Sequence, residues 1–289
     1  MTNSVFTGVC TALVTPFLNN KVNYPMLDQL LRRQINAKIP AVVLCGTTGE
    51  SATLSDMEKI EIFRRGKTYA GSQCKIIAGT GSNCTEHAIA LSKAAEDAGA
   101  DGLLVVSPYY NKANPDGLFA HYLAIAKSVN IPIIIYNIPT RTGVDIPVSV
   151  YRKLSKVPGI AGVKEASTDI TKIAKIKSEC GKEFNIWSGN DDQTLPVMAL
   201  GAQGVISVLS NVLPNEMRML TQYAAENNYD QAVLLHQTLL PLINLMFCDI
   251  NPIPVKAAMK LIGFDCGGCR LPLTELSEDK FKELQKYFA

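Results

Sequence analysis

Histidine and tryptophan are scarce in this 289-residue sequence, which contains three of the first and one of the second. The histidines, His87, His121 and His236, have none of the spacings typical of metal ligands, so the sequence predicts no metal site. Runs of five or six like charges are also absent, and 28 basic residues nearly balance 26 acidic ones. Proteins that bind nucleic acid usually carry a basic patch, so this composition argues against nucleic acid as a partner.

Long apolar runs are missing as well. No uncharged apolar run reaches the roughly 18 residues that suggest a membrane-spanning helix. Residues 1–4 do not begin the basic and then apolar pattern of an export signal. We therefore expect a cytoplasmic protein without a membrane partner. Its hydrophobic content of 47% is ample for a well-filled core.

The eight cysteines are scattered through apolar and helical segments rather than spaced as a disulfide framework. We expect reduced, mostly buried thiols. Cys266 and Cys269 form one C-x-x-C pair, a spacing found in redox and zinc sites, but no second pair with zinc-like spacing accompanies it. We interpret the pair as a turn with two spare thiols.

Short apolar segments rich in β-branched residues alternate with helical patterns over the first three quarters of the sequence. Their continuous rather than alternating apolar character is typical of parallel strands covered on both faces. Eight strands, each followed by a helix, predict a (β/α)8 barrel. The expected strands span residues 9–15, 41–44, 75–78, 102–107, 131–136, 160–164, 184–188 and 204–208.

Helix start signals support this alternation. Ser55 and Glu58 have the spacing of a capping box, and Asn114-Pro115 reads as a cap followed by a first-turn proline. A doubly wound sheet would usually carry a G-x-G-x-x-G turn after its first strand, whereas the nearest match, 79–84, follows the third and lacks the last glycine.

After residue 212 the β pattern stops and only helical patterns remain. We therefore predict a barrel over 1–225 and a helical C-terminal region over 226–289. The expected helices of this last part of the chain are 215–227, 230–247, 253–262 and 278–287.

The strand ends hold the residues that carry chemistry, because the C-terminal ends of barrel strands form the mouth of the active site. Lys164 follows the apolar run 160–163 directly. Burial disfavours the ammonium form of a lysine, and the neutral amine is a nucleophile that forms imines with ketones and aldehydes. The alternative is that Lys164 pairs with Glu165 or another carboxylate at the barrel rim.

Residues with hydroxyl groups stand at the ends of several other predicted strands. Tyr136, at the end of the fifth strand, would lie next to Lys164 and could carry protons, and Thr47 and Tyr110 could extend this relay. The alternative for such a tyrosine is packing at the rim.

Two further features could bind carboxylates. The turn 46–49 combines two glycines with Thr47 and Thr48, so its backbone N–H groups could face an anion, although it could equally be only a tight turn. Arg141, just past the fifth strand, could clamp a second carboxylate, although a lone arginine is often solvated.

Seven motifs together resemble the dihydrodipicolinate synthase family, also called 4-hydroxy-tetrahydrodipicolinate synthase, over nearly the whole chain. The resemblance implies a lyase without a cofactor that condenses pyruvate with L-aspartate 4-semialdehyde in the diaminopimelate and lysine pathway. It also implies a homotetramer built as a dimer of dimers. The motifs are GTTGES (46–51), SPYYN (107–111), YNIPTRTG (136–143), GVKEAS (162–167), SGNDD (188–192), GVISV (204–208) and NPIPVK (251–256).

The resemblance also implies a role for individual residues. Lys164 matches the Schiff-base lysine, and the tyrosine and threonine relay would be completed by Tyr110 from a neighbouring subunit. The implied catalytic residues are Lys164, Tyr136, Thr47 and Tyr110, and the implied substrate-binding residues are Thr48, Arg141, Gly189 and Ile206.

Two alternatives stay open at this point. N-acetylneuraminate lyase belongs to the same superfamily and shares the lysine, the tyrosine and a GxTGE turn, but an apolar residue usually occupies the position of Arg141 in that branch. A barrel that binds a keto acid or serves as a scaffold without turnover is the other alternative, because one fold hosts many functions.

Feedback inhibition by lysine is expected to be weak or absent. Asp56, Lys59 and His87 stand where lysine-sensitive members carry two histidines and a glutamate, so the ammonium of a bound lysine would lose a charge-assisted partner. The positions that match the lysine-binding cleft of the family are Ser51, Ala52, Asn83, His87 and Tyr109.

Overall fold

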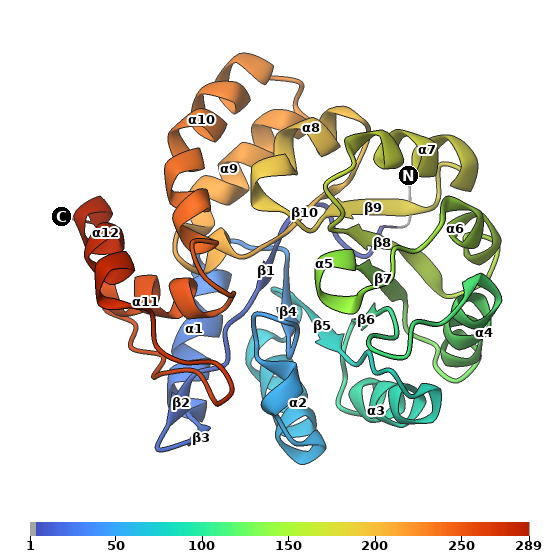
Figure 1. The fold of residues 1–289 in the computed structure, drawn as a ribbon, viewed down its shortest axis with the longest axis horizontal. Coiled ribbons are helices and arrows are strands. Elements are labelled where there is room, and N and C mark those ends of the chain that lie inside the picture. Colours follow the sequence, from blue (N-terminus) through green and yellow to red (C-terminus); the bar gives the residue numbers. More distant parts are fainter. Residues whose placement is uncertain (1–3, 289) are drawn as a thin grey trace.

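Eight parallel strands close into a barrel in the computed structural model, which describes residues 4–288 (Figure 1). Around the barrel the order is β1-β10-β9-β8-β7-β6-β5-β4, which is the chain order with β1 closing against β10. The predicted (β/α)8 barrel is confirmed. The strands are β1 (Gly8–Ala12), β4 (Ala41–Leu44), β5 (Lys75–Gly79), β6 (Gly102–Val106), β7 (Ile133–Asn137), β8 (Ile160–Glu165), β9 (Asn185–Ser188) and β10 (Gly204–Ser207).

Helices follow the strands and cover the outside of the barrel (Figure 1). The predicted capping box is present, since Ser55 accepts from the backbone of Glu58 and Glu58 accepts from the backbone of Ser55. Asn114 caps α4, and Pro115 is its first residue, as predicted. The outer helices are α1 (Tyr24–Asn36), α2 (Asp56–Ala70), α3 (Thr85–Asp97), α4 (Pro115–Ala126), α6 (Val148–Leu154), α7 (Ile170–Cys180), α8 (Thr194–Ala199) and α9 (Pro214–Ala225).

Some elements were not predicted because they are too short to show a hydrophobic period. β2 (Phe17–Leu18) and β3 (Lys21–Val22) form an antiparallel hairpin, and α5 (Pro139–Thr142) is a single helical turn after β7. The predicted first strand also ends early, at Ala12, so residues 13–15 lie in the loop beyond it.

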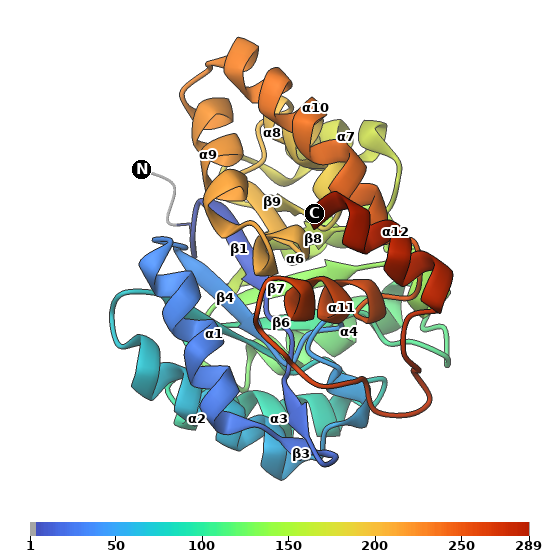
Figure 2. The ribbon, with the colours of Figure 1, turned by 90° about the vertical axis from the view of Figure 1, so that its left-hand side faces the viewer.

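Three helices follow the barrel and lie on one side of it, as Figure 2 shows for α10 (Tyr229–Met246), α11 (Ile253–Leu261) and α12 (Glu278–Phe288). The helical segments predicted for this part of the chain are therefore present, with ends shifted by one or two residues. The division of the chain between residues 225 and 226 stays a prediction.

Two ion pairs connect the C-terminal region to the barrel, and one of them is buried. Lys256 of α11 contacts Glu50, 2.5 Å away, and both side chains are almost fully buried. The backbone N–H of Arg270 donates to the other oxygen of Glu50 (2.9 Å), and its guanidinium donates to Glu58 of α2 (2.6 Å). Glu50 directly follows the turn 46–49, so the C-terminal region reaches the barrel mouth.

The core has two layers. A large outer layer lies between strands and helices, and a smaller inner layer fills the barrel. Trp187 of β9 is fully buried inside the barrel and stacks on Phe6, with ring centroids 4.9 Å apart. The interior is therefore a packed core, and space for chemistry remains only at the mouth.

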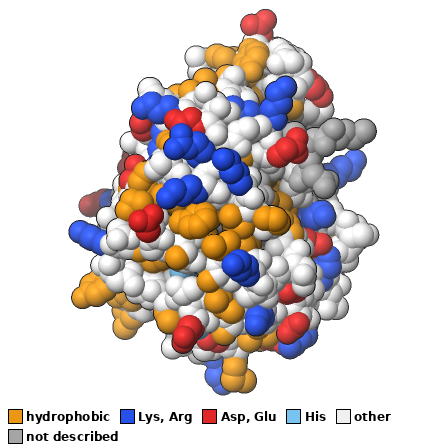
Figure 3. Space-filling model, turned by 90° about the vertical axis from the view of Figure 1, so that its right-hand side faces the viewer, with side chains coloured by type: hydrophobic (Ala, Val, Ile, Leu, Met, Phe, Trp, Pro, Cys, Tyr) orange, Lys and Arg blue, Asp and Glu red, His pale blue; other side chains and the backbone are white. Residues whose placement is uncertain are grey.

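The surface mixes both signs of charge. On the face in Figure 3, acidic and basic side chains surround a band of hydrophobic side chains across the middle. Within residues 4–288, none of the helices combines the length and the apolar character needed to cross a membrane.

All eight cysteines are free thiols. Burial raises the pKa of Cys266 to about 12 and that of Cys269 to about 11. Both thiols therefore stay protonated at neutral pH, which makes them weak nucleophiles.

Candidate active site

Lys164 and Tyr136 lie side by side inside the barrel. They are register partners on β8 and β7, and the ammonium nitrogen of Lys164 is 4.2 Å from the centroid of the Tyr136 ring. Each residue is only 5% exposed. The predicted neighbourhood of the lysine and the tyrosine is therefore present in the fold.

Glu165 points to the opposite face of β8, because successive side chains of a strand alternate. Its carboxylate is fully buried and accepts from the Asn137 side chain (2.7 Å), the Tyr151 hydroxyl (3.0 Å) and the backbone N–H of Ser167 (2.9 Å). Lys172 of α7 adds an ion pair at 3.4 Å. Burial raises the pKa of the Tyr151 phenol, so this group stays protonated and donates.

These contacts answer the question of whether Lys164 pairs with Glu165. Glu165 has its own partners outside the barrel, and Lys164 makes no ion pair within 4 Å in the part of the chain that the structure describes. Lys164 is therefore a buried amine that lies beside the Tyr136 ring and has no carboxylate partner of its own.

Asp191 is the buried carboxylate on the inner side. It follows β9 and accepts from the backbone N–H groups of Val208 and Leu209, both at 2.9 Å. Burial raises the pKa of Asp191, and the field of Lys164 acts in the opposite direction. Sequence analysis included Asp191 in the motif 188–192 but gave it no role, because its contacts join the loops after β9 and β10, which are separated in sequence.

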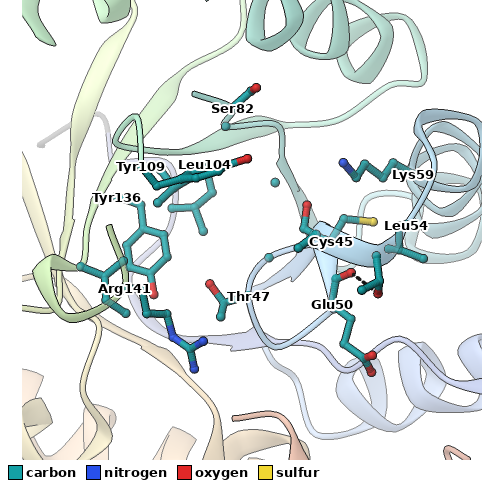
Figure 4. A pocket seen from close by; sticks show the side chains of 18 of the residues that line it. Cys45, Thr47, Glu50, Leu54, Lys59, Ser82, Leu104, Tyr109, Tyr136 and Arg141 are labelled. Carbon is teal, nitrogen blue, oxygen red and sulfur yellow. Dashed lines mark hydrogen bonds between the residues drawn. The ribbon is translucent and has the colours of Figure 1, made fainter. Parts of the chain in front are cut away.

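A cavity of about 660 Å³ opens at the mouth. Figure 4 shows Tyr136, Thr47 and Arg141 on one side of it, and Lys59 and Leu54 on the other. Three predicted site residues therefore share one cavity wall. The other predicted catalytic and substrate-binding residues are not in its lining: Lys164, Thr48, Tyr110, Gly189 and Ile206.

The turn 46–49 is a tight turn from which Thr47 lines the cavity. The carbonyl of Thr47 accepts from the backbone N–H of Glu50 at 3.0 Å. No side chain fits at Gly79 beside it, because a Cβ there would lie 2.2 Å from the carbonyl oxygen of Cys45. Thr48 is buried, and its hydroxyl oxygen accepts from the Asn251 side chain at 3.0 Å.

Arg141 lies on α5 with an exposed side chain. Its guanidinium donates to the backbone carbonyl of Asn251 at 3.1 Å, which leaves its other N–H groups for a ligand. Asn251 therefore contacts both Thr48 and Arg141. Sequence reasoning included Asn251 in a motif and assigned it no function.

Gly189, directly after β9, borders Lys164, and Ile206 lies on β10, one strand further around the barrel. A Cβ at Gly189 would lie 2.6 Å from the Cβ of Ala166 and 3.1 Å from the Cε of Lys164, so only glycine leaves room for the lysine. Ile206 is fully buried in the inner core layer.

Tyr110 stands apart from the other predicted relay residues. Its side chain is 90% exposed, and its backbone is in the left-handed region with φ of 72°. Tyr109 next to it is 40% exposed and lines the cavity. Within one chain, Tyr110 therefore does not complete the relay.

Most of the predicted lysine-binding positions line the cavity, and His87 lies at the end of it that contains Lys59 and Asp56. His87 contacts Asp56 at 2.8 Å, and Asp56 also pairs with Lys59 at 3.8 Å. Lys59 is only 8% exposed, so this end already holds a buried cation. Of the predicted positions, Ser51, Ala52, His87 and Tyr109 line the cavity, whereas Asn83 does not.

Among the described residues, no group of three or more histidine, cysteine, aspartate or glutamate side chains has the geometry to hold a metal ion.

The fold and the site define a class: (β/α)8-barrel enzymes with a buried lysine near the end of a strand and a mouth lined by hydroxyl groups. Within this class, residues 5–289 match the dihydrodipicolinate synthetase family, and the chain belongs to that family.

Relatives are similar in sequence to this chain over nearly its full length. The 4-hydroxy-tetrahydrodipicolinate synthase of Lachnoclostridium phytofermentans is 45% identical, and the alignment covers 97% of this chain and 96% of the relative. The crystal structure of dihydrodipicolinate synthase from Aquifex aeolicus is 42% identical, with a TM-score of 0.96 and coverage of 98% and 97%. The chloride-inhibited enzyme from Acinetobacter baumannii, solved with pyruvate, is 39% identical, with a TM-score of 0.95 and coverage of 97% of each chain. The predicted family, barrel fold and synthase function are confirmed.

Proposed function

We propose that this chain condenses pyruvate with L-aspartate 4-semialdehyde through an imine on Lys164. The observation that carries the proposal is the position of Lys164, buried on the inner face of β8 beside the Tyr136 ring and without an ion pair among the described residues. A structural lysine would have a carboxylate partner, as Lys172 has on the outer face.

The first half of the reaction makes the imine. The neutral amine of Lys164 adds to the ketone carbon of pyruvate, and the resulting carbinolamine loses water. Tyr136 and Thr47, which face the same cavity, transfer protons to the leaving oxygen. The protonated imine then withdraws electrons from the methyl carbon, which loses a proton to give an enamine.

The second half forms the carbon–carbon bond. The enamine carbon attacks the aldehyde carbon of the semialdehyde, and the aldehyde oxygen takes up a proton. The amino group of the semialdehyde then adds to the imine carbon, closes the ring and displaces the amine of Lys164. The lysine is regenerated, so the reaction needs neither a redox cofactor nor a reductant.

Two groups orient the substrates. The hydroxyls and backbone N–H groups at Thr47 and Thr48 bind the carboxylate of pyruvate, and Arg141 binds the carboxylate of the semialdehyde through its exposed guanidinium. Gly189 leaves space beside Lys164 for the keto acid, and Ile206 supplies an apolar wall.

The active form is proposed to be a homotetramer, a dimer of dimers, in the cytoplasm. Tyr110 is 90% exposed in a single chain, so it is free to enter the mouth of a neighbouring subunit and complete the relay there. The band of hydrophobic side chains in Figure 3 is typical of a surface that contacts another protein.

The proposal is tested by turnover of pyruvate and the semialdehyde, followed as NADPH consumption by a coupled reductase. The parent chain should turn over, and Lys164→Ala should lose at least about 10⁴-fold in kcat because no other group replaces the nucleophile. Turnover of N-acetylneuraminate in place of the semialdehyde reaction would contradict the proposal, as would full activity of the variant.

A further inference from the structure

Asn251 connects two parts of the proposed site that are far apart in sequence. It lies between α10 and α11, is 8% exposed and lines the cavity. Its side-chain nitrogen donates to the hydroxyl oxygen of Thr48 at 3.0 Å. Its backbone carbonyl accepts from Arg141 at 3.1 Å. The side chain therefore contacts one proposed carboxylate-binding group, and the backbone contacts the other.

The direction of the contact with Thr48 has a chemical consequence. A threonine hydroxyl has one proton to donate and two lone pairs that accept, whereas a carboxylate only accepts. Because Asn251 donates to the Thr48 oxygen, the hydroxyl keeps its own proton for another acceptor.

We propose that Asn251 is a positioning residue that directs the hydroxyl proton of Thr48 toward the carboxylate of pyruvate. The inference rests on the proposed function, which places that carboxylate at Thr48. In this role Asn251 acts through Thr48.

The nitrogen end of the Asn251 amide faces Thr48 in the structure. The side-chain oxygen of Asn251 is buried and accepts no hydrogen bond within residues 4–288. The bond to Thr48 is the one side-chain hydrogen bond that Asn251 makes in this range, so replacing the donor at residue 251 by an acceptor would reverse the direction of that bond.

Asn251→Asp is the sharpest test because it keeps the shape and replaces the donor with a charged acceptor. The Thr48 proton would then turn toward residue 251, and the new negative charge would repel the carboxylate of pyruvate. We expect the KM for pyruvate to rise roughly 10- to 100-fold. The KM for the semialdehyde should change less than about twofold, because Arg141 contacts only the backbone at this position.

Pyruvate binding can also be measured without the second substrate, from the rate at which borohydride traps the imine as the pyruvate concentration is varied. The half-saturating concentration should rise by the same factor as the KM. Asn251→Ala removes the donor without adding charge, so its rise should lie between the parent and Asn251→Asp. In a Thr48→Val background, Asn251→Ala should have no further effect on pyruvate binding.

Asn185 offers a matched control. It is a buried asparagine at the start of β9, where its side-chain nitrogen donates to the carbonyl of Ala161 at 2.9 Å and its oxygen has no partner within the described range. Asn185→Asp makes the same chemical change at the opposite end of the barrel. It should leave the half-saturating pyruvate concentration unchanged.

The outcomes separate the inference from the proposed function. Unchanged pyruvate binding in Asn251→Asp would overturn the inference, because it would mean that an acceptor already faced Thr48. An equal rise in both KM values, or the same rise in Asn185→Asp, would also overturn it and indicate a general structural loss. If the parent traps pyruvate but does not turn over the semialdehyde, the proposed function fails, while the trapping series still decides the inference. A parent that traps no pyruvate would overturn both.

Discussion

At the ends of β7 and β8, both faces of the barrel wall carry a buried lysine and a buried tyrosine, but the partners of these residues differ between the faces. Inside, Lys164 and Tyr136 are buried, and the lysine has no ion pair among the described residues. Outside, one step further along each strand, Asn137 and Glu165 belong to a network that includes Tyr151 and Lys172. Burial alone therefore does not mark a reactive residue, because both lysines are buried. The difference lies in whether the polar group has a partner.

The largest expected effect comes from replacing each of the two lysines by methionine in a separate variant. Lys164→Met should abolish turnover, a loss of at least about 10⁴-fold, and leave the free energy of unfolding unchanged or higher, because a buried polar amine without an ion pair is replaced by an apolar side chain. Lys172→Met should lower the free energy of unfolding by about 3 kcal/mol, because it leaves Glu165 and Asp145 without their cation, while turnover of the folded protein persists.

Urea unfolding and the coupled assay on the same preparations check both variants. The assignment of Lys164 as reactive and Lys172 as structural would be wrong if Lys172→Met lost turnover as completely as Lys164→Met. It would also be wrong if removal of Lys164 lowered the free energy of unfolding by several kcal/mol.

The two tyrosines give a second, smaller contrast. Tyr136→Phe should lower kcat about 100-fold because a proton-transfer group is lost. Tyr151→Phe should instead lower the free energy of unfolding by about 1–3 kcal/mol, since the buried carboxylate of Glu165 loses a donor, and should change kcat only a few-fold. Steady-state kinetics and denaturation of both variants test this, and a larger kcat loss in Tyr151→Phe than in Tyr136→Phe would count against the account.

The smallest expected effect concerns added lysine. The end of the cavity near His87 already contains the buried cation of Lys59, and His87 occupies one oxygen of Asp56, so a second ammonium would be repelled there. Millimolar lysine should change the rate by less than about twofold, and Lys59→Ala should increase the effect of lysine by removing the like charge. Strong inhibition of the parent chain in an inhibition series would show that this end accepts a cation after all.

Much of the inner face could be predicted from the sequence. Lys164 follows an apolar run, and Tyr136, Thr47 and Arg141 follow other strands, so the barrel topology alone brings them to one mouth. The outward direction of Glu165 also follows from the alternation of a strand, once the neighbouring lysine is assigned to the inside.

The remainder depends on contacts that no local pattern contains. Asn251 meets Thr48 across 203 residues of chain, and Asp191 accepts from backbone groups of the loop after β10. The hairpin of β2 and β3 consists of strands too short to show a period. These features depend on how the C-terminal region and the loops pack over the barrel, so they could not be predicted from the sequence.

The most direct test of the central claim is to trap the pyruvate imine with borohydride and locate the modified lysine by peptide mass spectrometry. Lys164 of β8 and Lys172 of α7 are buried to a similar extent. A difference in solvent exposure would therefore not explain which of them reacts. The account predicts modification at Lys164 and none at Lys172, because Asp145 and Glu165 on the outer face of the barrel already contact the Lys172 nitrogen. Modification of Lys172, or trapping that survives in Lys164→Met, would contradict it.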